Sequence, residues 1–419
     1  MAMETVVRPR IPMTQEELDM AIKRHELFIA GRPGGQRALL SYRDLSKLDL
    51  IGHNLTDADL TAANMEKARC AGTIFNNAAL FGVNLAHADL RGAKLVRTDL
   101  RGASLRGANL TGADLFDADL RDGTIAQKTR GGDLKTVVID NSASSDLVGA
   151  RMVNANLSQA RLSGAIAQHT DFTDALMRNC KLVRADLRNA VLNGCNLEGA
   201  EMSGADLRGA SMKNAILTGA DMTMVETAGA DMSGVMTDKP AGKSINELPE
   251  SIELLIHLHE LFVTSDGAEG KPLDVADYDL RKTHGWAGAR LTAFRANRAT
   301  MVGMDLEGAA LQAAQLEGAD LRSCRLVRAD LRGANLRGAR LNFADLRDAN
   351  LSPLALGKDR SLTTRLDAVE ARHADLRGAN LKSASLKGGD LSAANLTGAQ
   401  TEGADLTDTV LDDTVGIKR

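Results

Sequence analysis

The sequence predicts an all-β solenoid in which short extended pieces alternate with bends. From Leu45 to Ile125, almost every fifth residue is Leu, Met, Phe or Cys, and Ala or another small residue usually stands two positions earlier. A period of five matches neither the 3.6-residue period of a helix nor the two-residue period of a strand, so each five-residue cell contains an extended piece and a corner. Aromatic residues are only 3% of the chain, which indicates that it has no thick globular core.

The most regular cells, Ala103 to Leu115, have Asp, Asn or Ser before each Leu and a polar residue after it. They resemble the pentapeptide-repeat family, whose cell is Ala-(Asp/Asn)-Leu-polar-variable. The resemblance implies a right-handed quadrilateral β-helix with four cells in each coil. A square tube one side chain wide has no room for two large residues on each face, so we expect Leu and the Ala two positions earlier to point inward.

Two segments outside the repeat resemble each other and indicate an internal duplication. Both contain His-Glu-Leu-Phe, at His25–Phe28 and at His259–Phe262, and in each the apolar residues follow a helical period. Thr14 and Glu17 form a capping-box pattern before the first helix. The predicted order is a flexible tail (1–13), a capping helix (14–36), a first β-helix (37–236), a linker (237–246), a second helix (247–270), a second β-helix (271–411) and a tail (412–419).

The two helices are expected to cover open ends of the tandem solenoids. A β-helix terminus exposes its Leu column together with unpaired N–H and C=O groups, and an amphipathic helix hides both. An alternative places the second helix between the two solenoids, where it would set their angle. The duplicated His is expected to connect helix and coil by hydrogen bonding, although a functional role stays open. The structural cap residues are therefore His25, Phe28, His259 and Phe262.

Interruptions of the five-residue count predict two surface loops. The count slips after Ile125, which predicts a loop near 126–136, and it weakens at 352–365, where an irregular coil is the alternative to a loop. Three similar blocks place a Val beside a basic residue at an outward position, and two Phe also fall on outward positions. The candidate protein-contact residues are Lys128, Arg130, Lys358, Arg360, Val96, Val183, Val327, Phe81 and Phe116.

No catalytic, cofactor or metal site is predicted, because no nucleophile, base and orienting group come together at the observed spacings. The Asp and Asn before each Leu are expected to accept backbone hydrogen bonds at the bends, and the Arg after Leu to pair with nearby Asp. Cys70, Cys180, Cys195 and Cys324 are expected to point inward as small buried thiols. Disulfide or metal pairing requires stacking at multiples of twenty residues, and Cys180 and Cys195 are fifteen apart.

The charge balance weighs against nucleic acid as a partner. The net charge is −4, from 51 basic and 55 acidic residues, so no strong field of either sign is expected. No 18-residue apolar run is present, which predicts that the chain has no membrane span. A cytoplasmic location is the expectation, and secretion without a cleavable signal is not excluded by the sequence.

The predicted function is a non-enzymatic scaffold that binds an unidentified protein partner. The resemblance also implies two alternatives, a topoisomerase-interacting protein that imitates DNA and a translocated bacterial effector. The first fits less well because DNA-imitating relatives are acidic single solenoids, whereas this chain is charge-balanced and tandem. A homodimer through the C-terminal coil is expected, since end-to-end dimers recur in the family.

Overall fold

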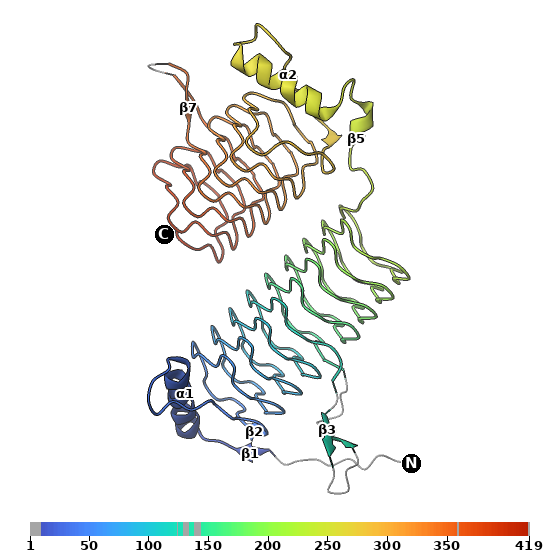
Figure 1. The fold of residues 1–419 in the computed structure, drawn as a ribbon, viewed down its shortest axis with the longest axis vertical. Coiled ribbons are helices and arrows are strands. Elements are labelled where there is room, and N and C mark those ends of the chain that lie inside the picture. Colours follow the sequence, from blue (N-terminus) through green and yellow to red (C-terminus); the bar gives the residue numbers. More distant parts are fainter. Residues whose placement is uncertain (1–9, 124, 129–133, 138–143, 358–359, 418–419) are drawn as a thin grey trace. The chain divides into compact units, whose positions relative to one another are not determined.

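The computed structural model describes residues 10–123, 125–128, 134–137, 144–357 and 360–417. The chain divides into two compact units, Met1–Lys239 and Pro240–Arg419. Each unit is a stack of four-sided coils around its own column of buried side chains (Figure 1). No helix among the described residues is long and apolar enough to cross a bilayer.

Each coil pairs with the next through parallel bridges between residues twenty apart, such as Asp59 with Ala79. Two hydrogen bonds make this bridge. Leu60 N donates to Ala79 O at 2.8 Å, and Ala79 N donates to Ala58 O at 2.9 Å. Four five-residue cells therefore make one coil, as the resemblance to pentapeptide repeats implies.

The inward positions are filled as predicted by one large and one small residue in each cell. Along the first unit Leu85, Leu90 and Leu95 are 0% exposed, and Ala88 and Ala93, each two positions before a Leu, are at most 1% exposed. The same alternation continues through the second unit. The prediction that Leu and Ala point inward is confirmed, and it extends to the four cysteines, which are all buried.

The corners are turns in which the second residue after Leu has a positive φ. Glycine takes this conformation without strain, as at Gly107 with φ 62°, and Asn and Asp tolerate it better than most other residues, as at Asn77 with φ 56°. The residue before Leu closes the same corner with its side chain: Asp59 Oδ1 accepts the Thr61 backbone N–H at 3.0 Å. The predicted role of the Asp and Asn series is confirmed.

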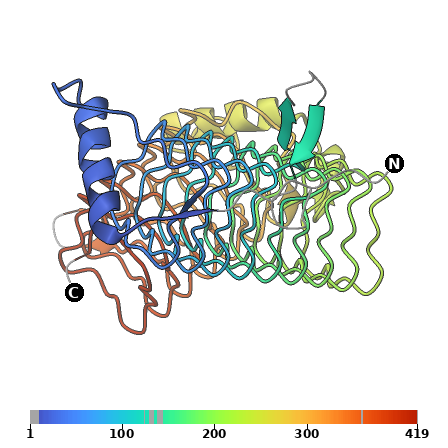
Figure 2. The same ribbon diagram turned by 90° about the horizontal axis from the view of Figure 1, so that it is seen from below.

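The first unit begins with β1 (Ile11–Pro12) and α1 (Gln15–Ile29). Strand β1 pairs in parallel with β2 (Arg43–Asp44) of the first coil. Thr14 caps α1 with a reciprocal capping box to Glu17. Helix α1 lies across the N-terminal end of the coils (Figures 1 and 2), where Leu18 and Ile22 join the core of the unit.

The second unit begins in the same way. Strand β5 (Lys243–Ser244) pairs in parallel with β6 (Tyr278–Asp279), and the 3-10 helix η1 (Ile245–Glu247) leads to α2 (Ile252–Thr264). Ile252 and Ile256 of α2 join the core of this unit. One feature differs from the first unit: the first coil holds an extra residue near Trp286, since Asp274 pairs with Arg295 and not with Phe294.

The two predicted loops contain antiparallel hairpins. In the first unit β3 (Ile125–Lys128) pairs with β4 (Leu134–Val137), and in the second β7 (Leu354–Ala355) pairs with β8 (Ser361–Leu362). Both hairpins interrupt the regular spacing of the bridges, because Ser104 pairs with Asp146 across the first and Asn335 pairs with Arg365 across the second.

Each hairpin therefore lengthens one coil. In the first unit the added chain has the length of the segment 122–143, and in the second it has the length of 353–362. Removing a segment of that length returns the bridge partners to their usual separation of twenty residues. The second interval thus contains an insertion and is not an irregular coil of normal length.

Candidate protein-interaction surfaces

The outer walls are covered by ion pairs within the sequence Asp-Leu-Arg. The guanidinium reaches back over the Leu to the carboxylate two residues earlier, as where Arg188 Nε and Nη2 meet Asp186 at 2.9 and 2.7 Å. This bidentate contact, with a further hydrogen bond from Gln168, holds the pKa of Asp186 down at about 2. The predicted surface lattice of ion pairs is confirmed. The same pair occurs at Asp89–Arg91, Asp99–Arg101, Asp119–Arg121, Asp206–Arg208, Asp330–Arg332, Asp345–Arg347 and Asp375–Arg377.

In these pairs the repeated carboxylates are occupied by hydrogen bonds and ion pairs within the protein. Each Asp of the lattice accepts both a backbone N–H and its own Arg, as Asp99 does from the Arg101 N–H and guanidinium. Within the described part of the chain, no three His, Cys, Asp or Glu side chains come together in a way that could hold a metal ion. The walls therefore present a fixed pattern of charge and shape, which suits contact with a macromolecule.

Two of the four buried cysteines, Cys195 and Cys324, act as hydrogen-bond donors inside the tube. Cys195 Sγ donates to Phe172 O at 2.8 Å and Cys324 Sγ to Met301 O at 2.9 Å, in each case to the preceding coil. Thr73 uses the same position, donating to Leu50 O at 2.6 Å. A thiol or hydroxyl replaces Ala at this inward position because a carbonyl of the preceding coil lies within reach.

We predict that all four thiols are unreactive in the folded protein. Burial raises the pKa of Cys70, Cys180, Cys195 and Cys324 well above that of a free thiol, so the nucleophilic thiolate is scarce and inaccessible. Titration with Ellman's reagent at pH 8 should give no fast reaction in buffer and four thiols in guanidinium chloride. Fast stoichiometric labelling of native protein would contradict this assignment.

Each hairpin leaves its coil at a corner that a buried hydroxyl closes. In the first unit Ser145 Oγ accepts the Gly102 N–H at 3.1 Å and lies 3.0 Å from Arg121 O and 3.3 Å from Leu100 O. Arg121 precedes the hairpin and Ser145 follows it, so this side chain joins the two ends of the insertion to the coil below.

Thr364 occupies the corresponding place at the second hairpin. Its Oγ1 accepts the Gly333 N–H at 2.8 Å and lies 3.0 Å from Ser352 O and 3.4 Å from Leu331 O. Ser145 and Thr364 are both 0% exposed. The coils are therefore continuous on both sides of each insertion, and the hairpins are additions to an intact tube. Sequence reasoning missed these two residues, although each is a hydroxyl at the first inward small position after the interruption.

The predicted hairpin contacts are only partly described. Arg130 and Lys358 lie outside the described residues. Lys128 ends strand β3, and Arg360 is exposed immediately before β8. Leu356 follows β7, across the hairpin from Arg360. It is 51% exposed and donates its N–H to Arg360 O at 2.8 Å. The tip of this hairpin therefore presents an apolar residue that the sequence analysis did not select.

The outward apolar candidates differ in accessibility. Val96 and Phe116 are twenty residues apart, so they stack on neighbouring coils as one half-buried patch. Phe81 instead supports the first hairpin: the Arg101 guanidinium lies 5.2 Å from its ring centroid, and a Cβ added to Gly123 would come within 2.9 Å of the ring. Phe81 is half-buried, as Val96 and Phe116 are, and Gly123 and Arg101 contact part of its ring, so its role as a protein contact stays a prediction.

The other two valines differ in how accessible they are. Val183 is half-buried, and Val327 is only 8% exposed. The prediction that Val327 stands at an accessible outward position is therefore wrong.

The duplicated histidines join the helices to the first coils. His25 is fully buried, its Nδ1 accepts the Ala38 N–H at 3.1 Å, and its Nε2 lies 2.9 Å from Thr56 O. An Nδ1 that accepts and an Nε2 that donates require the neutral ring, and burial lowers the pKa of His25 accordingly. The ring also stacks on Phe28, with centroids 5.9 Å apart.

His259 repeats most of this arrangement in the second unit. Its Nδ1 accepts the Leu273 N–H at 2.9 Å, and its ring stacks on Phe262 with centroids 6.3 Å apart. Its buried Nε2 faces Thr292, the counterpart of Thr56, without reaching hydrogen-bond geometry. Burial lowers the pKa of His259 as well.

Comparison with known proteins gives one family match. A model described as pentapeptide repeats matches eight segments, which together include more than half of the 419 residues. A search of curated proteins finds no significant match. The matched segments are 38–77, 54–88, 84–122, 144–179, 180–219, 287–322, 314–352 and 372–413.

Three solved structures illustrate the similarity. A pentapeptide repeat protein from the Arabidopsis thaliana thylakoid lumen is 33% identical over 20% of this chain and 66% of its own, just under two thirds, with a TM-score of 0.19. Rfr23 from the cyanobacterium Cyanothece 51142 is 32% identical over 32% of this chain and 88% of its own, with a TM-score of 0.19. QnrB1, a plasmid-mediated fluoroquinolone resistance protein, is 19% identical over 47% and 78%, with a TM-score of 0.22.

Proposed function

Since this chain belongs to the pentapeptide-repeat family, we propose that it is a non-enzymatic protein-interaction scaffold built on right-handed quadrilateral β-helices. The observation that carries the proposal is the pair of hairpins, each inserted at a corner that a buried hydroxyl closes. Hairpins on a tube that stays intact beneath them are contact elements held by a rigid base.

In this proposal the two helices have a structural role. His25 joins α1 to the first coil of the first unit, and His259 joins α2 to the first coil of the second. The partner-binding elements are then the hairpins and the half-buried patch of Val96 and Phe116. The Arg360 and Leu356 pair at the second hairpin combines a charge with an exposed apolar side chain, a composition common in protein interfaces.

The scaffold ranks ahead of a protein that imitates DNA because of the charges on the walls. An imitation of duplex DNA requires rows of uncompensated carboxylates, since the duplex itself carries a dense row of negative charge. Here the repeated Asp-Leu-Arg pairs place a guanidinium beside each carboxylate. The walls are consequently close to neutral at the scale of one coil.

Deletions that restore the repeat test the proposal. Removing residues 122–143 takes out the added chain and brings Asp119 and Arg161 back to twenty apart, and removing 353–362 does the same for Asn335 and Arg365. Both variants keep the closing hydroxyl, so each serves as the folding control for the other, checked by circular dichroism. Pull-downs from the native cell should lose a distinct set of partners for each deletion. Identical partner sets for both deletions and the intact chain would overturn the proposal.

A further inference from the structure

Two sides of the first coil of the first unit, those of Asp44 and Asp49, are paired with the segment that precedes it, and His25 of α1 contacts the third. Met13 N donates to Asp44 O at 3.2 Å as β1 pairs with β2. The Gln15 side-chain amide takes the place of a backbone peptide, accepting the Asp49 N–H at 2.9 Å and donating to Asp49 O at 3.0 Å. On the third side, which begins at Asn54, His25 Nε2 lies 2.9 Å from Thr56 O.

The fourth side, at Leu39, stays open. In the later coils of this unit the bridge residue directs both its N–H and its C=O to the preceding coil, as Asp59 does toward Ala38 and Leu40. Leu39 is the first bridge residue of its side, and among the described residues nothing pairs with its N–H or C=O. Its side chain is 63% exposed. An unpaired edge with an exposed apolar side chain is a template for one added strand.

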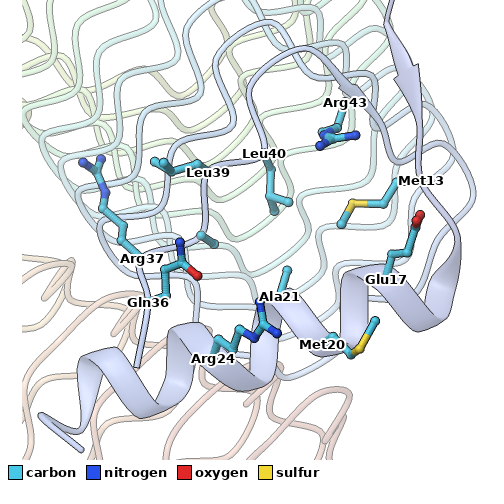
Figure 3. A pocket seen from close by; sticks show the side chains of 11 residues that line it. Met13, Glu17, Met20, Ala21, Arg24, Gln36, Arg37, Leu39, Leu40 and Arg43 are labelled. Atoms are coloured by element: carbon cyan, nitrogen blue, oxygen red, sulfur yellow. The ribbon is translucent and has the colours of Figure 1, made fainter. Parts of the chain in front are cut away.

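A groove lies along this edge, between the first coil and α1. Its volume is about 390 Å³, and Figure 3 shows the coil residues Gln36 to Leu40 on one side and Met20, Ala21 and Arg24 of α1 on the other. Leu40 and Met13 add apolar surface, and Met20 is 56% exposed. A groove of this size and lining accommodates a few residues of extended chain, including one apolar side chain.

The groove carries a net positive charge, because three arginines and one carboxylate, Glu17, line it. Arg24, Arg37 and Arg43 line it, and none of them forms an ion pair with a carboxylate among the described residues, unlike the arginines of the Asp-Leu-Arg lattice. The Glu17 carboxylate at the groove is engaged in the capping box with Thr14. Arg37 donates its Nε to Asp57 O at 2.6 Å, which leaves its terminal nitrogens for another acceptor.

The second unit lacks these features at the corresponding edge. Leu273, whose N–H meets His259, corresponds to Ala38, so Asp274 stands where the first unit has Leu39 and Pro272 where it has Arg37. A charge and a proline are devices that protect a free edge from pairing. An edge that combines an exposed apolar side chain with a nearby Arg is therefore specific to the first unit.

We propose that this groove binds an acidic extended segment of a partner protein, which adds one parallel strand to the edge at Leu39. The segment has the form Asp-x-(Val/Leu)-apolar-Asp. Its third residue pairs with Leu39, and its fourth enters the apolar part of the groove between Leu40 and Met20. This inference rests on the proposed scaffold function and names the chemistry of one partner.

The position of the Asp follows from a contact within the chain itself. Where Asp279 bridges Thr300, the residues two positions earlier form a corner ion pair, with Asp277 bound by Arg298 Nε and Nη2 at 2.7 and 2.8 Å. The Asp belongs to the earlier strand and the Arg to the later one. An added strand takes the place of the earlier strand, so an Asp two positions before the residue facing Leu39 lies opposite Arg37.

The charge of the groove selects this occupant over the chain's own first residues. Residues 1–9 contain one acidic and one basic side chain, Glu4 and Arg8, so they bring no net negative charge to three arginines. The binding segment supplies negative charge through a carboxylate at each end, one beside Arg37 and one near Arg43.

A peptide titration on the full chain tests the proposal. The probe is fluorescein-labelled Gly-Asp-Ser-Val-Leu-Asp-Ser, and a matched peptide carries Lys for both Asp. Anisotropy should show that the acidic peptide binds with a Kd on the order of 10–100 µM. The Kd of the basic peptide should be higher by about tenfold or more. Leu39→Asp, which installs the residue of the second unit, and Arg37→Glu should each weaken binding of the acidic peptide by about tenfold or more.

Ile51→Asp is the matched control. Ile51 is an exposed apolar residue on the same coil, 41% exposed, beside the edge that Gln15 covers, so this variant should bind as the parent does. Equal binding by Leu39→Asp, or equal binding of the basic peptide, overturns the proposal. Self-association of the chain that Leu39→Asp abolishes, without peptide binding, also overturns it by assigning the groove to a second copy. The hairpin deletions leave this groove intact, so the two proposals fail separately.

Discussion

Ala113→Leu is expected to destabilise the first unit by about 3 kcal/mol, at the upper end of the cost of overfilling a core. Ala113 is 1% exposed and shares its face of the tube with Leu115. The walls are held at fixed spacing by bridges to both neighbouring coils, such as Asp114 to Lys94 and to Asn156, so they cannot move apart to accept three more carbon atoms. Urea unfolding followed by circular dichroism measures the loss.

Ala113→Thr is the control for that experiment. Threonine already occupies the equivalent inward position at Thr98 and Thr170, where its hydroxyl donates to a carbonyl of the preceding coil at 2.9 and 2.7 Å. The new hydroxyl would meet Leu90 O in the same way, so the change in free energy of unfolding should stay within about 1 kcal/mol. A Leu variant as stable as the Thr variant would show that the tube has more room than its geometry indicates.

His25→Leu is expected to cost about 3 kcal/mol and to remove part of the acid sensitivity of the protein. The substitution leaves the Ala38 N–H and Thr56 C=O without their partner at the end of the first coil. Unfolding in urea at pH 7.5, 6 and 5 measures both effects. His257→Leu, at an exposed position of α2, is the matched control and should leave the pH dependence unchanged.

The sign of the pH dependence follows from the lowered pKa of His25. Below about pH 6.5 the unfolded chain binds a proton that the folded chain excludes, so stability falls as the pH drops toward the folded pKa and changes no further below it. His373, whose pKa burial lowers to about 4, adds to the same trend. Stability of the parent protein that is constant from pH 7.5 to 5 would contradict the neutral, accepting His25.

The tube could be predicted from the sequence because its cause is local. A Leu every fifth residue with Ala two positions earlier, as at Ala103 and Leu105, has few packing solutions, and each cell repeats the same one. The same holds for corner residues such as Asp59, which bonds the backbone only two residues away. Five-residue periodicity therefore predicts the coil, its interior and the ion pairs on its walls.

The contact surfaces could not be predicted in the same way because they depend on segments far apart in the sequence. Phe81 looks like a free aromatic until Gly123, from a much later part of the chain, lies on it. Gln15 reads as an ordinary first-turn residue, although its amide completes the pairing of Asp49. The open side at Leu39 is visible only once the contacts of the other three sides are known.

The buried hydroxyls of Ser145 and Thr364 keep the coil intact whatever the length of the insertion beside them. The insertion is long in the first unit and short in the second, yet in both the closing hydroxyl contacts the same set of three backbone groups. The structure of the coil beneath therefore does not depend on the length of the insertion. New binding segments of other lengths can therefore be grafted at these two corners while the coils above and below keep their spacing.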